Sequence, residues 1–114
     1  MKVLITGAAG YIGSVLTRLL LRKNYEVVGF DNLLFGGHSL VNILSIPNFT
    51  FIKGDIQNKD EIESAMQDVD AIIHLAAIVG DPACSAQPDL TKKINYDATK
   101  SLYDMASHKK NITK

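Results

Sequence analysis

The chain lacks tryptophan and has a single cysteine, Cys84, so no disulfide can form within it. A lone cysteine is typical of a reducing compartment, and we expect a cytoplasmic protein. Net charge is also absent, because twelve Lys and Arg residues balance twelve Asp and Glu residues. This balance removes the long-range field that attracts nucleic acid or an anionic membrane. No hydrophobic run is long enough to cross a bilayer, and the amino terminus does not resemble a signal peptide.

Metal-binding and nucleophilic side chains are equally scarce. Three histidines and one cysteine at wide spacing do not make a metal site. Cys84 has no evident cluster of cations nearby, which favours a packing role in a loop or beside a substrate over a role as nucleophile. The 114 residues, of which 46% are hydrophobic and 21% charged, suit one ordinary globular domain over residues 1–114.

The hydrophobic pattern alternates between short apolar runs and stretches with helical spacing. The apolar runs predict buried parallel strands at residues 2–6, 26–30, 49–53 and 71–75. Helical spacing predicts helices at residues 11–23 and 89–109, a shorter helix from Asn58 or Asp60 to Asp68, and one or two turns within residues 40–46. Residues 78–88 are predicted to form a loop, and the last four residues are assigned to no element. Such alternation predicts an α/β fold with a parallel sheet and right-handed crossovers.

Apolar side chains within the helices predict which stripe of each helix packs together. The stripes are Ile12, Leu16, Leu19 and Leu20 in the first helix, Ile62, Ala65 and Met66 in the short helix, and Leu90, Ile94, Ala98, Leu102 and Met105 in the last.

A glycine-rich turn, TGAAGYIG, joins the first strand to the first helix. Gly7 permits a tight turn, Gly10 lets the backbone approach a pyrophosphate, and Gly13 lets the helix lie close to the sheet. Asp31 follows the second strand, where its carboxylate can accept hydrogen bonds from ribose hydroxyls and repel a 2′-phosphate. Either feature alone also occurs at ordinary turns, but together and in this order they predict a site for NAD rather than NADP.

These residues resemble the extended short-chain dehydrogenase/reductase superfamily, in particular its NAD-dependent epimerase/dehydratase branch, which acts on nucleotide sugars. TGAAGYIGS is similar to the TGxxGxxG turn of that family, and FDNL resembles its second-strand acid followed by Asn. The resemblance implies NAD as cofactor and a Rossmann-type sheet of strand order 3-2-1-4, the first half of a doubly wound fold. It also implies cofactor contacts along the turn and at the end of the second strand, at Tyr11, Ile12 and Asn32.

Three later segments extend the resemblance. Gly54-Asp55-Ile56 looks like the segment after the third strand, which implies that Asp55 meets the adenine amino group and Ile56 flanks the ring. His74-Leu75-Ala76-Ala77 resembles the HxAA segment, whose small residues let the backbone pass beside the cofactor. Asn95 looks like the family's Asn at the start of the fourth helical region, which implies contact with the cofactor or its supporting backbone. His74 itself, at the end of an apolar strand, is read as a packing or hydrogen-bonding residue rather than a base.

The family's catalytic residues are a Ser or Thr after the fifth strand and a Tyr-x-x-x-Lys pair on the next helix, and these 114 residues end before that strand. Tyr96 and Lys100 match the spacing of the pair, but they follow Asn95 directly, one strand and one helix too early, and we read them as a helix-surface pair. The resemblance therefore implies the NAD-binding portion of a nucleotide-sugar epimerase or dehydratase, inactive alone. A stand-alone NAD-binding or sensing module and a purely structural domain are the alternatives.

This interpretation implies an unpaired strand edge in the sheet. The strand at residues 71–75 would lack its neighbour on one side, and an open apolar edge invites pairing with another chain. We therefore expect dimerisation or aggregation through this edge.

Overall fold

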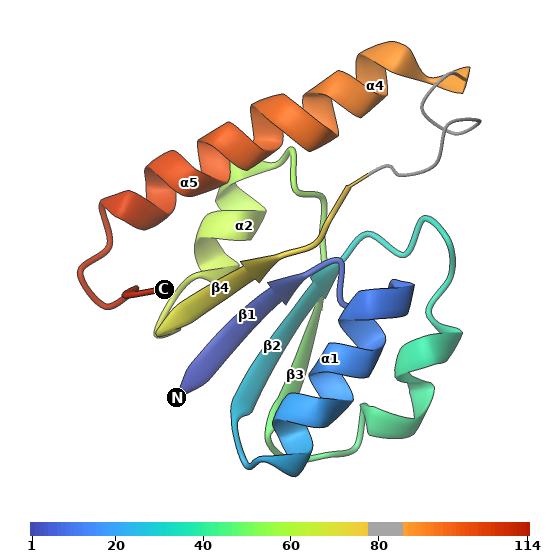
Figure 1. Cartoon of the computed structure of the whole chain (residues 1–114), viewed down its shortest axis with the longest axis vertical. Helices are drawn as coiled ribbons and strands as arrows, with labels where there is room; N and C mark the ends of the chain where they lie inside the picture. The colour runs from blue at the N-terminus through green and yellow to red at the C-terminus, as the bar shows by residue number, and fades with distance from the viewer. Residues whose placement is uncertain (78–85) are drawn as a thin grey trace.

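The computed structural model describes residues 1–77 and 86–114 (Figure 1). Four strands form one parallel sheet in the order β3-β2-β1-β4, as expected. Their bounds are β1 Lys2–Thr6, β2 Glu26–Asp31, β3 Phe49–Lys53 and β4 Ala71–His74. Strand β1 is central and pairs Leu4 with Val28 on one side and with Ile72 on the other. Both neighbours and both faces cover it, which explains its uninterrupted apolar sequence.

Helices cover both faces of the sheet (Figure 1). They are α1 Tyr11–Arg22, α2 Lys59–Ala65, α4 Pro88–Lys92 and α5 Thr99–Ser107, with a 3-10 helix η1 at His38–Ile43 and a π-helix η2 at Lys93–Ala98. Leu4 and Phe30 belong to a core cluster with residues of α2, η2 and α5, whereas Val3 and Ile5 pack on the other face with residues of α1 and η1. Alternate side chains of each strand thus belong to two separate cores, one on each face of the sheet.

The buried face of α1 differs from the predicted stripe. Its fully buried residues are Gly13, Ser14 and Thr17, while Ile12 and Leu19 are 65% and 47% exposed. A Cβ atom at position 13 would lie 2.1 Å from the carbonyl oxygen of Gly7, so the helix packs against the turn at backbone distance. Small residues make this approach possible. Of the predicted stripe, Leu16 and Leu20 are partly buried against the core, whereas Ile12 and Leu19 are turned outward.

The short helix α2 begins at the predicted cap and ends early. The Asn58 side chain accepts hydrogen bonds from the backbone N–H groups of Asp60 and Glu61. The helix ends at Ala65, three residues before Asp68, whose φ of 62° is in the left-handed region. The predicted inward residues of this helix, Ile62, Ala65 and Met66, are buried as expected.

The last helical region is continuous in outline but not uniform (Figure 1). The single predicted helix consists instead of α4, the π-helix η2 and α5 in succession. The predicted stripe nevertheless packs against the core, with Ile94, Ala98 and Leu102 buried and Leu90 and Met105 partly buried. A spacing of four residues fits a π turn nearly as well as an α turn, so the pattern does not reveal the widened segment.

The carboxyl-terminal residues, for which the sequence pattern predicts no element, lie along the outer edge of β4. The Thr113 N–H donates to the Asp70 carbonyl at 2.9 Å, and the Ile72 N–H donates to the Lys114 carbonyl at 2.9 Å. The Asn111 side chain also donates to the Val69 carbonyl at 2.7 Å. The start of this edge is therefore paired, contrary to the expectation that the whole edge is open.

Within residues 1–77 and 86–114, no helix combines the length and apolarity needed for a membrane crossing. Cys84 and most of the predicted loop at residues 78–88 lie outside the described residues, and Pro88 already belongs to α4.

Candidate dinucleotide-binding cleft

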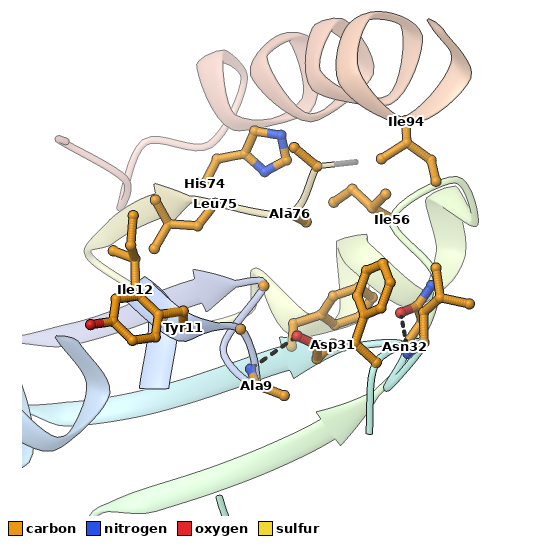
Figure 2. Close-up of a pocket in the computed structure, with 18 of the residues that line it drawn as sticks. Ala9, Tyr11, Ile12, Asp31, Asn32, Ile56, His74, Leu75, Ala76 and Ile94 are labelled. Atoms are coloured by element: carbon orange, nitrogen blue, oxygen red, sulfur yellow. Dashed lines mark hydrogen bonds between the residues drawn. The ribbon is translucent and has the colours of Figure 1, made fainter. Parts of the chain in front are cut away.

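A cleft of about 910 Å³ opens at the carboxyl ends of the strands (Figure 2). In parallel sheets this is the place where ligands bind, and the volume is that of a small-molecule site. The predicted site residues that line it are Gly7, Gly10, Tyr11, Ile12, Gly13, Asp31, Asn32, Ile56, Leu75, Ala76 and Ala77. The topology thus brings together segments from four different parts of the chain.

The three glycines of the turn meet different surroundings. Gly7 has a φ of 75°, and a Cβ atom there would lie 2.8 Å from the backbone of Leu75 and Ala76. Gly13 faces the Gly7 carbonyl, as described above. A Cβ atom on Gly10 would meet only the Gly7 carbonyl oxygen, at 3.2 Å. The fold itself therefore requires glycine at positions 7 and 13, whereas the small size of Gly10 chiefly leaves room in the cleft.

The amino terminus of α1 faces the cleft without a side-chain cap. Gly10 is the N-cap, and the first intrahelical bond runs from the Ser14 N–H to the Gly10 carbonyl. The N–H groups of Tyr11, Ile12 and Gly13 thus have no helix carbonyl to bond. No acidic residue lies in the first turn to offset the positive end of the helix dipole. This end of the helix is suited to an anion.

Asp31 is held against the glycine turn (Figure 2). Its Oδ2 accepts a hydrogen bond from the Ala9 N–H at 2.9 Å, and its Oδ1 accepts one from the Leu33 N–H at 2.8 Å. An ionised carboxylate has about four acceptor sites, so two remain for a ligand. The neighbouring Asn32 side chain accepts from the Leu34 N–H at 3.0 Å, which shapes the following loop.

A second contact braces the turn from the side of η1. The Ser39 hydroxyl donates to the Ala9 carbonyl at 2.6 Å, and Arg18 donates to the carbonyls of Ser14 and Ser39. The backbone of Ala9 is therefore held by both its N–H and its carbonyl. A turn fixed in this way is preorganised for a ligand.

His74 lies between two threonines on the opposite wall of the cleft. Its Nδ1 is 2.6 Å from the hydroxyl of the fully buried Thr6, and its Nε2 is 2.8 Å from the hydroxyl of Thr99. Burial lowers the pKa of His74. The side chain is hydrogen bonded at both ring nitrogens, as a structural histidine is.

Asp55 and Asn95 are not among the lining residues, although Gly54, Ile56 and Ile94 beside them are. The Asp55 carboxylate accepts from the Gln57 N–H at 2.8 Å, and Asn95 is exposed on η2. Tyr96 is 61% exposed on η2. Neither Tyr96 nor Lys100 lines the cleft, in keeping with a surface pair.

Several lining residues are not predicted by the sequence pattern. They are Ala9, Phe30, Leu34, Phe35, Gly54, His74, Ile94 and Thr99. Phe30 carries a signal, as the aromatic residue that ends the second apolar run. Phe35 is 84% exposed and lies in an irregular loop, where no periodicity marks a side chain as part of a site.

Residues 3–114 match the model of the NAD dependent epimerase/dehydratase family. The chain belongs to this family. It is 42% identical over 87 residues to an uncharacterized UDP-glucose epimerase, YtcB, of Bacillus subtilis, a match that covers 70% of this chain and 27% of that protein.

Solved structures of family members share the fold. The UDP-glucuronic acid 4-epimerase of Bacillus cereus, in complex with UDP-glucuronic acid and NAD, superposes with a TM-score of 0.88 at 34% identity over 96% of this chain and 37% of its own. The dTDP-glucose 4,6-dehydratase DesIV of Streptomyces venezuelae, with NAD bound, gives 0.85 at 32% identity over 93% and 35%. The chain thus spans about a third of the length of these proteins.

Proposed function

We propose that the cleft binds NAD, with Asp31 at the adenosine ribose. The observation that carries this proposal is the carboxylate of Asp31, held 2.9 Å from the Ala9 N–H at the side of the glycine turn. That contact sets its remaining lone pairs beside the helix end that suits an anion. In a dinucleotide the adenosine ribose is joined directly to the pyrophosphate, so a ribose site must lie beside a pyrophosphate site, as Asp31 lies beside this helix end.

The rest of the cleft fits the other parts of the cofactor. The first-turn N–H groups of α1 and the space beside Gly10 receive the pyrophosphate. Ile56, which is buried beneath the cleft, flanks the adenine, with Asp55 near its amino group. Leu75, Ala76 and Ala77 form the wall along the nicotinamide side, and Asn95 supports that wall from η2.

NAD is favoured over NADP by charge. A 2′-phosphate at the adenosine ribose would meet the Asp31 carboxylate, and two like charges at contact distance in a partly buried site repel strongly. Among the described residues that line the cleft there is no Lys or Arg to offset that repulsion. Asp31 therefore acts as the selectivity residue.

For the protein as a whole, we propose a nucleotide-sugar epimerase or dehydratase of which this chain supplies the NAD-binding portion. The names and bound ligands of the relatives support this substrate class. Bound NAD supplies hydride transfer in such an enzyme. Proton transfer also needs an acid/base. Among the described residues, Tyr96 is on the surface and His74 is hydrogen bonded at both ring nitrogens, so we propose that the chain is inactive alone. Its single cysteine supports a cytoplasmic setting.

Titration calorimetry of the 114-residue chain with NAD and with NADP tests the cofactor proposal. We expect NAD to bind and NADP to bind more weakly. Asp31→Asn should lower the affinity for NAD about tenfold or more, through loss of charge-assisted hydrogen bonds, and should reduce the preference for NAD over NADP. Asp104→Asn, an exposed carboxylate on α5, is the matched control and leaves both affinities unchanged. A folded chain with no affinity for NAD would overturn the proposal.

A further inference from the structure

The hydroxyl of Thr6 occupies a position where three polar groups meet. It lies 3.1 Å from the Leu75 N–H, 3.2 Å from the Ala76 N–H and 2.6 Å from His74 Nδ1. Backbone N–H groups only donate, so the hydroxyl oxygen accepts from both. Its single proton must then point to His74. Nδ1 is therefore the acceptor in that contact.

An acceptor at Nδ1 determines the state of the whole ring. The imidazole is neutral and carries its proton on Nε2, which donates to the Thr99 hydroxyl at 2.8 Å. Burial acts in the same direction, because it lowers the pKa of His74 and so disfavours the second proton. Thr6, His74 and Thr99 form one directional chain of hydrogen bonds, from the end of β1 through β4 to the start of α5.

This chain of bonds joins the walls of the cleft. Leu75 and Ala76, which Thr6 holds, line the cleft, and their backbone packs so close to Gly7 that a Cβ atom there would come within 2.8 Å. Thr99 follows the π-helix η2 and lines the cleft with Ile94. In a π-helix, residues five apart fall on nearly the same face, so the widened turn directs both side chains to the cleft.

We propose that Thr6 and His74 are positioning residues for the dinucleotide: the Thr6–His74–Thr99 relay, with His74 as the neutral Nε2–H tautomer, sets the Leu75–Ala76 wall against the glycine turn. The relay rests on the proposed function for its ligand, but its own geometry is present in the free protein. None of the three side chains needs to touch the cofactor for the wall to be displaced when one is changed.

Two changes at Thr6 separate this role from simple stability. Thr6→Val keeps the shape but leaves the Ala76 N–H without its acceptor, while the Leu75 N–H keeps only its bond to the Thr6 carbonyl at 3.0 Å. We expect NAD affinity to fall about tenfold, the equivalent of one lost buried hydrogen bond. Thr6→Ser restores the hydroxyl and recovers most of that affinity. Thr17→Val is the matched control, because Thr17 is equally buried and its hydroxyl donates to the Gly13 carbonyl within α1. It lowers stability and leaves NAD affinity within twofold.

The ring nitrogens of His74 give a readout that does not depend on the cofactor. Nitrogen-15 spectra of the free chain at neutral pH should show Nδ1 unprotonated and Nε2 protonated, and Thr6→Val should abolish this single tautomer. If Thr6→Val does not fold, Thr99→Val tests the same relay from its other end. A proton on Nδ1, or a folded Thr6→Val variant with unchanged affinity, would overturn the relay. Failure of the wild-type chain to bind NAD would instead overturn the proposed function, while the spectra still decide the relay.

Discussion

At the scale of single residues, the glycines of the turn have separable roles. Gly13→Ala places a Cβ atom 2.1 Å from the Gly7 carbonyl oxygen, whereas Gly10→Ala meets the same oxygen at 3.2 Å. We expect Gly13→Ala to lower the free energy of unfolding by about 3 kcal/mol or more, as severe overpacking does. Gly10→Ala should cost about 1 kcal/mol, because alanine is a poorer N-cap than glycine by that order, and it should also weaken NAD binding. Urea unfolding and calorimetry measure the two effects, and equal losses of stability would contradict the distinction.

His74 gives the stability of the chain a pH dependence of known sign. Burial lowers its pKa below the ordinary 6.5, so the unfolded chain takes up the proton at a higher pH than the folded chain does. Stability from this group is complete above pH 6.5 and is lost as the pH falls through the lowered pKa. Urea unfolding at several pH values between 7.5 and 5 measures the slope. We expect His74→Gln to flatten it, whereas His108→Gln, at an exposed position, leaves it unchanged.

At the scale of elements, the strands are the most predictable part of the molecule. The apolar runs predict all four to within one residue, because a short apolar run between polar turns is typical of a strand buried in a parallel sheet. The burial of α1 is not predictable in the same way. Leu16 and Leu20 of the predicted stripe are partly buried, but the most buried residues of its inner face are Gly13, Ser14 and Thr17, which a hydrophobic pattern assigns to no core. What places them inside is the close approach of the helix to the turn, a tertiary contact.

The site shows the same division between local and tertiary information. Gly7, Gly13 and Asp31 are identifiable because the sequence pattern of a dinucleotide-binding turn has glycine at fixed positions and an acidic residue after the next strand. The Thr6–His74–Thr99 contacts join residues up to 68 positions apart in the sequence, and no spacing predicts them. The π-helix η2 is not predictable for a different reason, because its buried residues keep a spacing that is common to α-helices and π-helices.

At the scale of the whole molecule, the feature that matters most is the outer edge of β4. In a parallel strand, alternate residues direct their backbone groups to opposite edges. Because the Leu75 N–H bonds to the Thr6 carbonyl, those of Ile72 and His74 face outward. The tail pairs with the edge at Asp70 and Ile72, which is the part nearest the start of the strand. Self-association through the remainder of the edge stays a prediction.

A substitution in the tail tests how much this pairing protects the molecule. Thr113→Pro removes the N–H that donates to the Asp70 carbonyl, while Thr113→Ala keeps it and removes only the side chain. We expect the proline variant to lose about 1 kcal/mol of stability, as for one backbone hydrogen bond, and to self-associate more than the parent chain because more of an apolar edge is exposed. Light scattering over a range of concentrations measures the association. A proline variant as monodisperse as the alanine variant would show that the tail does not protect this strand edge. It would also show that copies of the chain do not associate through the edge.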